Sequence, residues 1–179
     1  DEILDGLGIA YEEVVQDNPT KSCDDAARER GLETKQIVKS LIIESEGEKF
    51  HVLLPGDRTL SEKKLGFAEN SPGDFSSQKS SGGQISNIRL ISPEKSEEIT
   101  GFESGTVHPF STGLVHLIDE RVFENDKVSH TVGEKQRAVI MSSEAFREAV
   151  DESDFSFEVR DFAVSTDEDF EQVEAKGLD

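Results

Sequence analysis

The sequence predicts an α+β protein in which helices surround a mixed, mostly antiparallel, barrel-like sheet. Two observations predict this class. Capping signals mark several short helices, and runs rich in Val, Ile and Leu lie between them without a regular strand–helix alternation. The length of 179 residues suits a single hydrophobic core. We therefore expect one domain over residues 1–150 and an acidic extension over residues 151–179 that packs on it.

The expected helices are marked by their terminal residues. Ser22 and Asp25 form a capping box for a helix that Gly31 ends, and Thr59 and Glu62 form a second box. The helices predicted in this way cover residues 22–31, 59–65, 92–101, 143–150 and 166–177.

Short apolar runs between these helices predict the strands. Residues 37–44 and 49–54 are joined through Glu46-Gly47 and predict a hairpin. Further strands are expected at residues 88–91, 113–119, 127–132, 137–141 and 155–164. Residues 69–87 are rich in Ser and Gly and predict a flexible surface loop.

The chain is strongly acidic, with 39 acidic and 19 basic side chains and a net charge of −20. The acidic residues are spread along the whole chain and Trp is absent, which is typical of a halophilic protein; an ordinary acidic mesophilic protein is the alternative. In molar salt the screening length falls to about 3 Å, so this charge does not exclude a nucleic-acid partner. No apolar run approaches the length of a membrane-spanning helix, and we expect a cytoplasmic protein.

The common catalytic signatures are absent from the sequence. It contains no phosphate-binding G-x-x-x-x-G-K loop, no H-E-x-x-H helix and no G-x-S-x-G elbow. The four histidines have no metal-binding spacing, and we interpret His51 and His116, which lie in strand patterns, as structural. Cys23 is the single cysteine of the sequence, so an internal disulfide is excluded. Its position at a helix start could lower the pKa of its thiol, although a packing role is favoured. We predict no metal and no cofactor.

Two features remain as candidate sites. Lys39 lies in the run IVKSLIIE, where both faces of a strand would be apolar, so its ammonium must either reach solvent or meet an anion in a pocket. In the segment GFESGTVHPF, Gly105 and Pro109 bracket a tight loop whose backbone N–H groups could bind a carbonyl or an oxyanion. An ordinary turn is the alternative for this loop.

These segments together carry a resemblance to a known family. In order they are IVKSLII, a helix ending KKL, ISPEKSEEITGFESGTVHPF, LVHLIDE and VGEKQRAVIMSSEAF. Over about residues 9–150 the chain resembles the YbaK-type aminoacyl-tRNA deacylases, which include the editing domain of bacterial prolyl-tRNA synthetases. The resemblance implies a free-standing editing hydrolase that deacylates mischarged tRNA, expected to be proline tRNA carrying alanine or cysteine. A non-catalytic module of the same fold that binds tRNA ends or a synthetase is the first alternative. A small-molecule-binding domain is the second.

The resemblance also implies roles for particular residues. Lys39 would neutralise a phosphate near the terminal adenosine, and the loop from Gly105 to Pro109 would hold the aminoacyl carbonyl. His108 stands where many members have a small residue, and it is either a general base or a residue that shapes the pocket. The implied catalytic residues are Lys39, Gly105 and His108, and the implied substrate-binding residues are Ser40, Thr106, Val107, Pro109 and Asp119. The expected partners are the 3′ end of aminoacyl-tRNA and a prolyl-tRNA synthetase.

Overall fold

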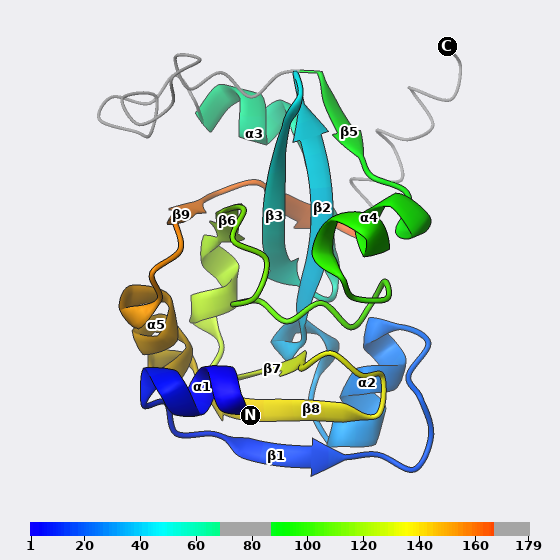
Figure 1. Ribbon diagram of the computed structural model, residues 1–179, viewed down its shortest axis with the longest axis vertical. Helices are drawn as coiled ribbons and strands as arrows, with labels where there is room; N and C mark the ends of the chain where they lie inside the picture. Colours follow the sequence, from blue (N-terminus) through cyan, green and yellow to red (C-terminus); the bar gives the residue numbers. More distant parts are fainter. Residues whose placement is uncertain (69–86, 167–179) are drawn as a thin grey trace.

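The computed structural model describes residues 1–68 and 87–166, and its largest unit is a five-stranded sheet in the order β5-β2-β3-β6-β9 (Figure 1). β2 and β3 form the predicted antiparallel hairpin, β5 pairs antiparallel with β2, and β6 and β9 continue the sheet in parallel. The bounds are β2 Val38–Ser45, β3 Glu48–Pro55, β5 Ile88–Leu90, β6 Val115–Asp119 and β9 Phe157–Arg160.

A three-stranded antiparallel sheet lies across one end of the β2–β3 hairpin (Figure 1). It contains β1 (Glu12–Val15), β8 (Arg137–Ser142) and β7 (Lys127–Thr131) in that order, and a bridge between Ile37 and Ser129 joins it to the start of β2. A further antiparallel pair is formed by β4 (Arg58–Leu60) and β10 (Ala163–Ser165). The predicted α+β class with mostly antiparallel pairing is confirmed, and the described strands form open sheets that do not close into a barrel.

The helices are short and lie around these sheets. They are α1 (Glu2–Leu7), α2 (Cys23–Arg30), α3 (Glu62–Ala68), α4 (Pro93–Thr100) and α5 (Ser143–Glu152), with 3-10 turns η1 (Thr34–Gln36) and η3 (Glu120–Glu124). The predicted cap of α2 is confirmed: Ser22 Oγ accepts from the Asp25 N–H, and Gly31 ends the helix in the left-handed region.

Three predicted boundaries are corrected. The Thr59–Glu62 capping box is wrong, because Thr59 belongs to β4 and the Ser61 hydroxyl accepts from the Lys64 N–H instead. Likewise α5 is capped by Ser142 rather than by its first residue. The single strand predicted over residues 155–164 is divided into β9 and β10. The loop predicted at 69–87 and the helix predicted at 166–177 lie almost wholly outside the described residues.

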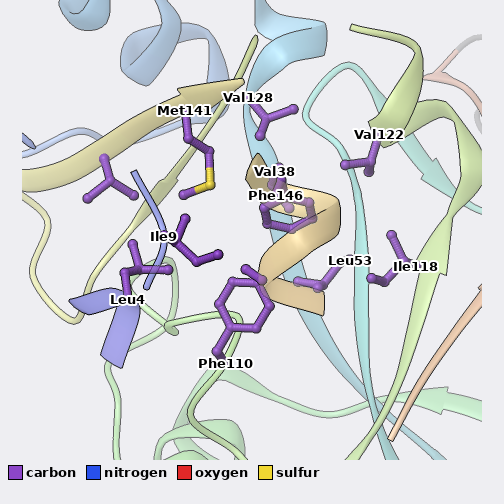
Figure 2. Close-up of a cluster of buried hydrophobic side chains, with 12 residues drawn as sticks. Leu4, Ile9, Val38, Leu53, Phe110, Ile118, Val122, Val128, Met141 and Phe146 are labelled. Carbon is purple, nitrogen blue, oxygen red and sulfur yellow. The ribbon is translucent and has the colours of Figure 1, made fainter. Parts of the chain in front are cut away.

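Hydrophobic side chains form a main core between the two larger sheets and a second core on the far face of β3. In β3, Leu53 packs into the main core, whereas Val52 and Leu54 pack into the second one because side chains alternate along a strand. Figure 2 shows the main core, where Phe146 of α5 and Phe110 lie beside Leu53. The start of β2 is therefore held on both sides by packed apolar groups, which fixes the place of Lys39 and Ser40.

Candidate functional site

A cavity of about 290 Å³ opens at the start of β2. The residues that line it are 20–23 and 26 at the start of α2, Arg30 at the end of α2, 37–41 at the start of β2, 104, 105 and 107 of the loop after α4, and 131 and 135. Four residues predicted for the site, Lys39, Ser40, Gly105 and Val107, line this one cavity although the chain separates them by more than sixty positions.

The cavity is strongly cationic. Lys21, Arg30, Lys39 and Lys135 line it, and none of its lining residues is Asp or Glu. This is unusual in a chain whose net charge is −20, where a random patch of surface carries excess negative charge. Lys135 pairs with Glu103 at 2.9 Å, so the local positive potential that attracts an anionic ligand comes mainly from Lys21, Arg30 and Lys39.

Lys39 reaches the cavity from within the sheet. It is half-buried, and its Nζ donates to the main-chain carbonyl of Arg58. Of the two alternatives left open by the sequence, the structure favours a pocket, because the ammonium lies in a partly enclosed space. The neighbouring Cys23 thiol has its pKa raised by burial, an effect that the charge of Lys39 opposes. The helix start therefore does not lower the pKa of Cys23, and the thiol stays protonated.

Arg30 is a buried cation without a carboxylate partner in the described part of the chain. Only 8% of it is exposed. Its Nε donates to Gln16 Oε1 at 2.9 Å and its Nη1 to Ser129 Oγ at 3.0 Å, while its Nη2 has no hydrogen-bond partner among the described residues. Burial lowers the pKa of Arg30 to about 10. Buried charges are normally paired, so this guanidinium keeps an uncompensated charge beside the cavity.

The sequence analysis did not single out Arg30. A signal was available: Ala26, Ala27 and Arg30 lie at helical spacing and share the buried face of α2. An arginine on an otherwise small, apolar face is a candidate for a buried charge.

The loop after α4 is held in place by its own backbone contacts. The Thr106 N–H donates to the Glu103 carbonyl, the Gly133 N–H donates to the Thr106 carbonyl, and the Thr131 hydroxyl donates to the Gly105 carbonyl. Gly105 has a φ of +87°, and a Cβ built there would meet nothing within 4 Å. Among the described residues, the N–H groups of Gly105 and Val107 donate to no acceptor. Both residues line the cavity and lie in a loop that these bonds hold in place.

His108 does not share this cavity. It is buried against a second space of about 400 Å³ that is also lined by Asp1, Phe102 and Arg137. Its Nδ1 accepts from the Phe110 N–H at 3.1 Å and its Nε2 lies 3.2 Å from Asp1 Oδ1, while burial lowers its pKa to about 4.

The other three predicted residues also lie outside the lining. Thr106 is buried, and its hydroxyl donates to the Glu103 carbonyl at 2.7 Å. Pro109 is buried in the same loop. Asp119, at the end of β6, is fully buried and accepts from the N–H groups of Phe162 and Ala163 at 2.9 and 2.8 Å. These contacts are structural, because they hold the turn between β9 and β10.

The described residues hold no cluster of three or more His, Cys, Asp or Glu side chains that could bind a metal ion. No helix in residues 1–68 or 87–166 is long and apolar enough to cross a membrane. The polar residues that line the cavity are the four basic side chains and the hydroxyl residues Thr20, Ser22, Ser40, Ser104 and Thr131.

Comparison with known proteins gives one family and several solved structures. Residues 17–149 match the model of the aminoacyl-tRNA editing domain. The fold is similar to that of the hypothetical protein APE2540, with a TM-score of 0.71 and 23% identity over 91% of this chain and 97% of that one. It is also similar to a candidate trans-editing enzyme for prolyl tRNA synthetase, with a TM-score of 0.70 and 23% identity over 92% and 94% of the two chains. No curated protein matches the chain.

Proposed function

The chain belongs to the aminoacyl-tRNA editing domain family, and we propose that it is a free-standing hydrolase that removes the amino acid from mischarged tRNA. The observation that carries the proposal is the cavity itself. It joins a cationic lining, which suits the phosphates of an RNA 3′ end, to two backbone donors, which suit an ester carbonyl.

In this proposal the basic side chains and the loop N–H groups have different roles. Lys39 neutralises a phosphate next to the terminal adenosine, and Lys21 and Lys135 at the cavity wall add to the same field. The N–H groups of Gly105 and Val107 receive the charge that develops on the carbonyl oxygen as water attacks. An aminoacyl ester is already activated, so positioning and these donors are sufficient for a large acceleration.

The expected substrate is proline tRNA that carries a small amino acid, alanine or cysteine. The preference for a small amino acid is taken from the family that the chain resembles, and the cavity of about 290 Å³ is the proposed place of the aminoacyl group. The proline tRNA part of the proposal is supported by the similarity in fold to the candidate trans-editing enzyme for prolyl tRNA synthetase. A prolyl-tRNA synthetase is the proposed protein partner, and the proposed location is the cytoplasm.

The acidic remainder of the molecule fits an environment of high salt, and we propose a halophilic origin. The net charge of −20 repels RNA in dilute buffer, whereas in molar salt the screening length falls to about 3 Å. The assay therefore uses molar KCl.

The test measures deacylation of proline tRNA charged with alanine, cysteine or proline, with Lys39→Ala and a control. Lys95→Ala is the matched control, because Lys95 is an exposed lysine of α4 that pairs with Glu98 and does not line the cavity. Lys39→Ala is expected to lower kcat/KM about a hundredfold, and Lys95→Ala to leave it within twofold. Binding of charged tRNA without turnover would instead identify a non-catalytic module. Equal loss in both variants would refute the role of Lys39.

A further inference from the structure

Ser40 connects the cavity to a chain of buried side chains behind it. Ser40 and His51 are diagonal neighbours on one face of the β2–β3 hairpin, and Ser40 Oγ lies 2.9 Å from His51 Nε2. The other ring nitrogen, Nδ1, lies 2.9 Å from Thr112 Oγ1. Thr112 Oγ1 lies 3.4 Å from Nε2 of His116, whose Nδ1 lies 3.2 Å from the carbonyl oxygen of Ser156.

The Ser156 carbonyl at the far end of these contacts gives one consistent assignment of the hydrogen-bond directions. A carbonyl oxygen only accepts, so we assign the proton of the His116 ring to Nδ1, which faces the Ser156 carbonyl; the carbonyls of Pro109 and Leu114 also interact with this ring. Burial lowers the pKa of His116 to about 4, so the ring is neutral and its Nε2 is an acceptor. Thr112 therefore donates its hydroxyl proton to His116 and accepts from His51 Nδ1.

The same reasoning gives the tautomer of His51 and the orientation of Ser40. His51 is fully buried, and burial, with the nearby His116 and His108, lowers its pKa well below its ordinary value, so it is neutral. Because its Nδ1 carries the proton, its Nε2 must accept, and the proton comes from the Ser40 hydroxyl. In this assignment the hydroxyl proton of Ser40, a residue that lines the cavity, is used by His51, and its oxygen can only accept a further hydrogen bond.

From this network we propose that Ser40 is a catalytic residue that orients the attacking water, and that His51 is the positioning residue that orients Ser40. The inference rests on the proposed function. In the cavity the water donates one hydrogen bond to Ser40 Oγ, which turns a lone pair towards the ester carbonyl carbon. The water oxygen bonds to that carbon, the bond to the ribose oxygen breaks, and the proton lost by water ends on the released ribose hydroxyl.

The burial of His51 argues against Ser40 as a nucleophile. A serine that attacks the ester must be followed by protonation of the leaving oxygen, and a histidine with 0% exposure reaches the cavity only through Ser40 itself. Once Ser40 carried the acyl group, that route would be closed. Orientation of water requires no proton to leave His51.

Three variants test the proposal against wild type by steady-state deacylation between pH 5 and 9. Ser40→Ala is expected to lower kcat about tenfold to a hundredfold with KM within threefold. His51→Phe, which cannot accept from Ser40, is expected to show a similar loss. His51→Gln is expected to stay within about fivefold, because its amide can both accept from Ser40 and donate to Thr112. His130→Gln is the matched control, since His130 is also buried and is not one of the hydrogen-bonded residues between Ser40 and Ser156.

The outcomes separate this inference from the function on which it rests. Active wild type with an equally active Ser40→Ala overturns the inference alone. A His51→Gln variant also overturns it if the variant is inactive and its pH–rate profile lacks an ionisation that the wild-type profile shows. That result would make His51 a general base. Imidazole ¹⁵N NMR reads the tautomer without turnover, and a proton on His51 Nε2 also overturns the inference. Wild type that hydrolyses no ester refutes the proposed function, and the role of Ser40 falls with it.

Discussion

Replacing Arg30 by Met should weaken the binding of RNA without a large loss of stability. Arg30→Met keeps most of the unbranched chain that packs on the buried face of α2 and removes only the guanidinium. An arginine paired with a buried carboxylate would cost about 3–5 kcal/mol on removal. Arg30 has no such carboxylate among the described residues, so the free-energy change on its removal is set by its desolvation penalty and by its two hydrogen bonds.

The magnitude follows from the contacts of the guanidinium. Burial lowers its pKa from the ordinary value of an arginine to about 10, which corresponds to about 3 kcal/mol against the charged form in the folded state. For a base with a lowered pKa this penalty is present at every pH below about 10, so it acts fully at pH 7. Removing the charge relieves it, while the loss of the bonds to Gln16 Oε1 and Ser129 Oγ, which leaves these two oxygens without their donor, costs about 2–4 kcal/mol. The net change in stability is expected within about 2 kcal/mol of zero.

Urea denaturation and equilibrium binding of a short CCA-ended RNA, both at fixed high salt, measure the two effects. Binding is expected to weaken about tenfold to thirtyfold, because one of four cavity cations is lost. Arg28→Met is the matched control, since Arg28 lies on the same helix, is 71% exposed and pairs with Asp25. A variant that loses 4 kcal/mol or more of stability and binds RNA as wild type does would make Arg30 a structural residue and refute the reasoning.

Three further substitutions separate the proposed catalytic loop from the structural residues near it. Gly105→Ala and Gly101→Ala place a Cβ at similar positive φ values with no atom within 4 Å, so each should cost about 1–2 kcal/mol of stability, but only Gly105→Ala should lower kcat, by about a hundredfold. A comparable loss of turnover in both would show that strain alone is responsible. Asp119→Ala leaves the buried N–H groups of Phe162 and Ala163 without an acceptor and should lower the free energy of unfolding by about 3–5 kcal/mol, measured by urea denaturation. Unchanged stability with a raised KM would instead place Asp119 at the edge of the substrate site.

Local signals in the sequence predicted the ends of α2 and the β2–β3 hairpin, but they placed the starts of α3 and α5 wrongly, and α1 was not predicted. The Ser22 cap and the Gly31 stop depend on a few neighbouring residues, which is why they could be predicted without tertiary structure. Strand β1 and the division between β9 and β10 could not, since the partner of β1 is β8, more than a hundred residues away. The break between β9 and β10 coincides with the two N–H groups that Asp119 accepts, a contact that no local pattern shows.

The residues of the candidate site likewise include some that the sequence indicated and some that only the folded structure shows. The resemblance pointed to Lys39 and the loop at Gly105, and the structure places both on one cavity. Arg30 was missed because its burial and the lack of a partner for its Nη2 among the described residues can be seen only in the folded structure. His51 was interpreted as a structural histidine, and its contacts do satisfy both ring nitrogens. The assigned direction of the hydrogen bond from Ser40 to His51 depends on the Ser156 carbonyl, which is far away in the sequence.

The position of the cations inside a cavity resolves the conflict between an acidic protein and an anionic substrate. Charges on an open surface are screened beyond about 3 Å in molar salt, so the acidic exterior exerts little repulsion there and basic surface residues would exert little attraction. Partly buried charges are screened much less, and the 8% exposed Arg30 and the half-buried Lys39 are of this kind. A phosphate that enters the cavity therefore meets four cations at short range, while the net charge of −20 remains outside. It follows that RNA affinity should depend on salt less steeply in the cavity than a count of four phosphate contacts on an open surface would give.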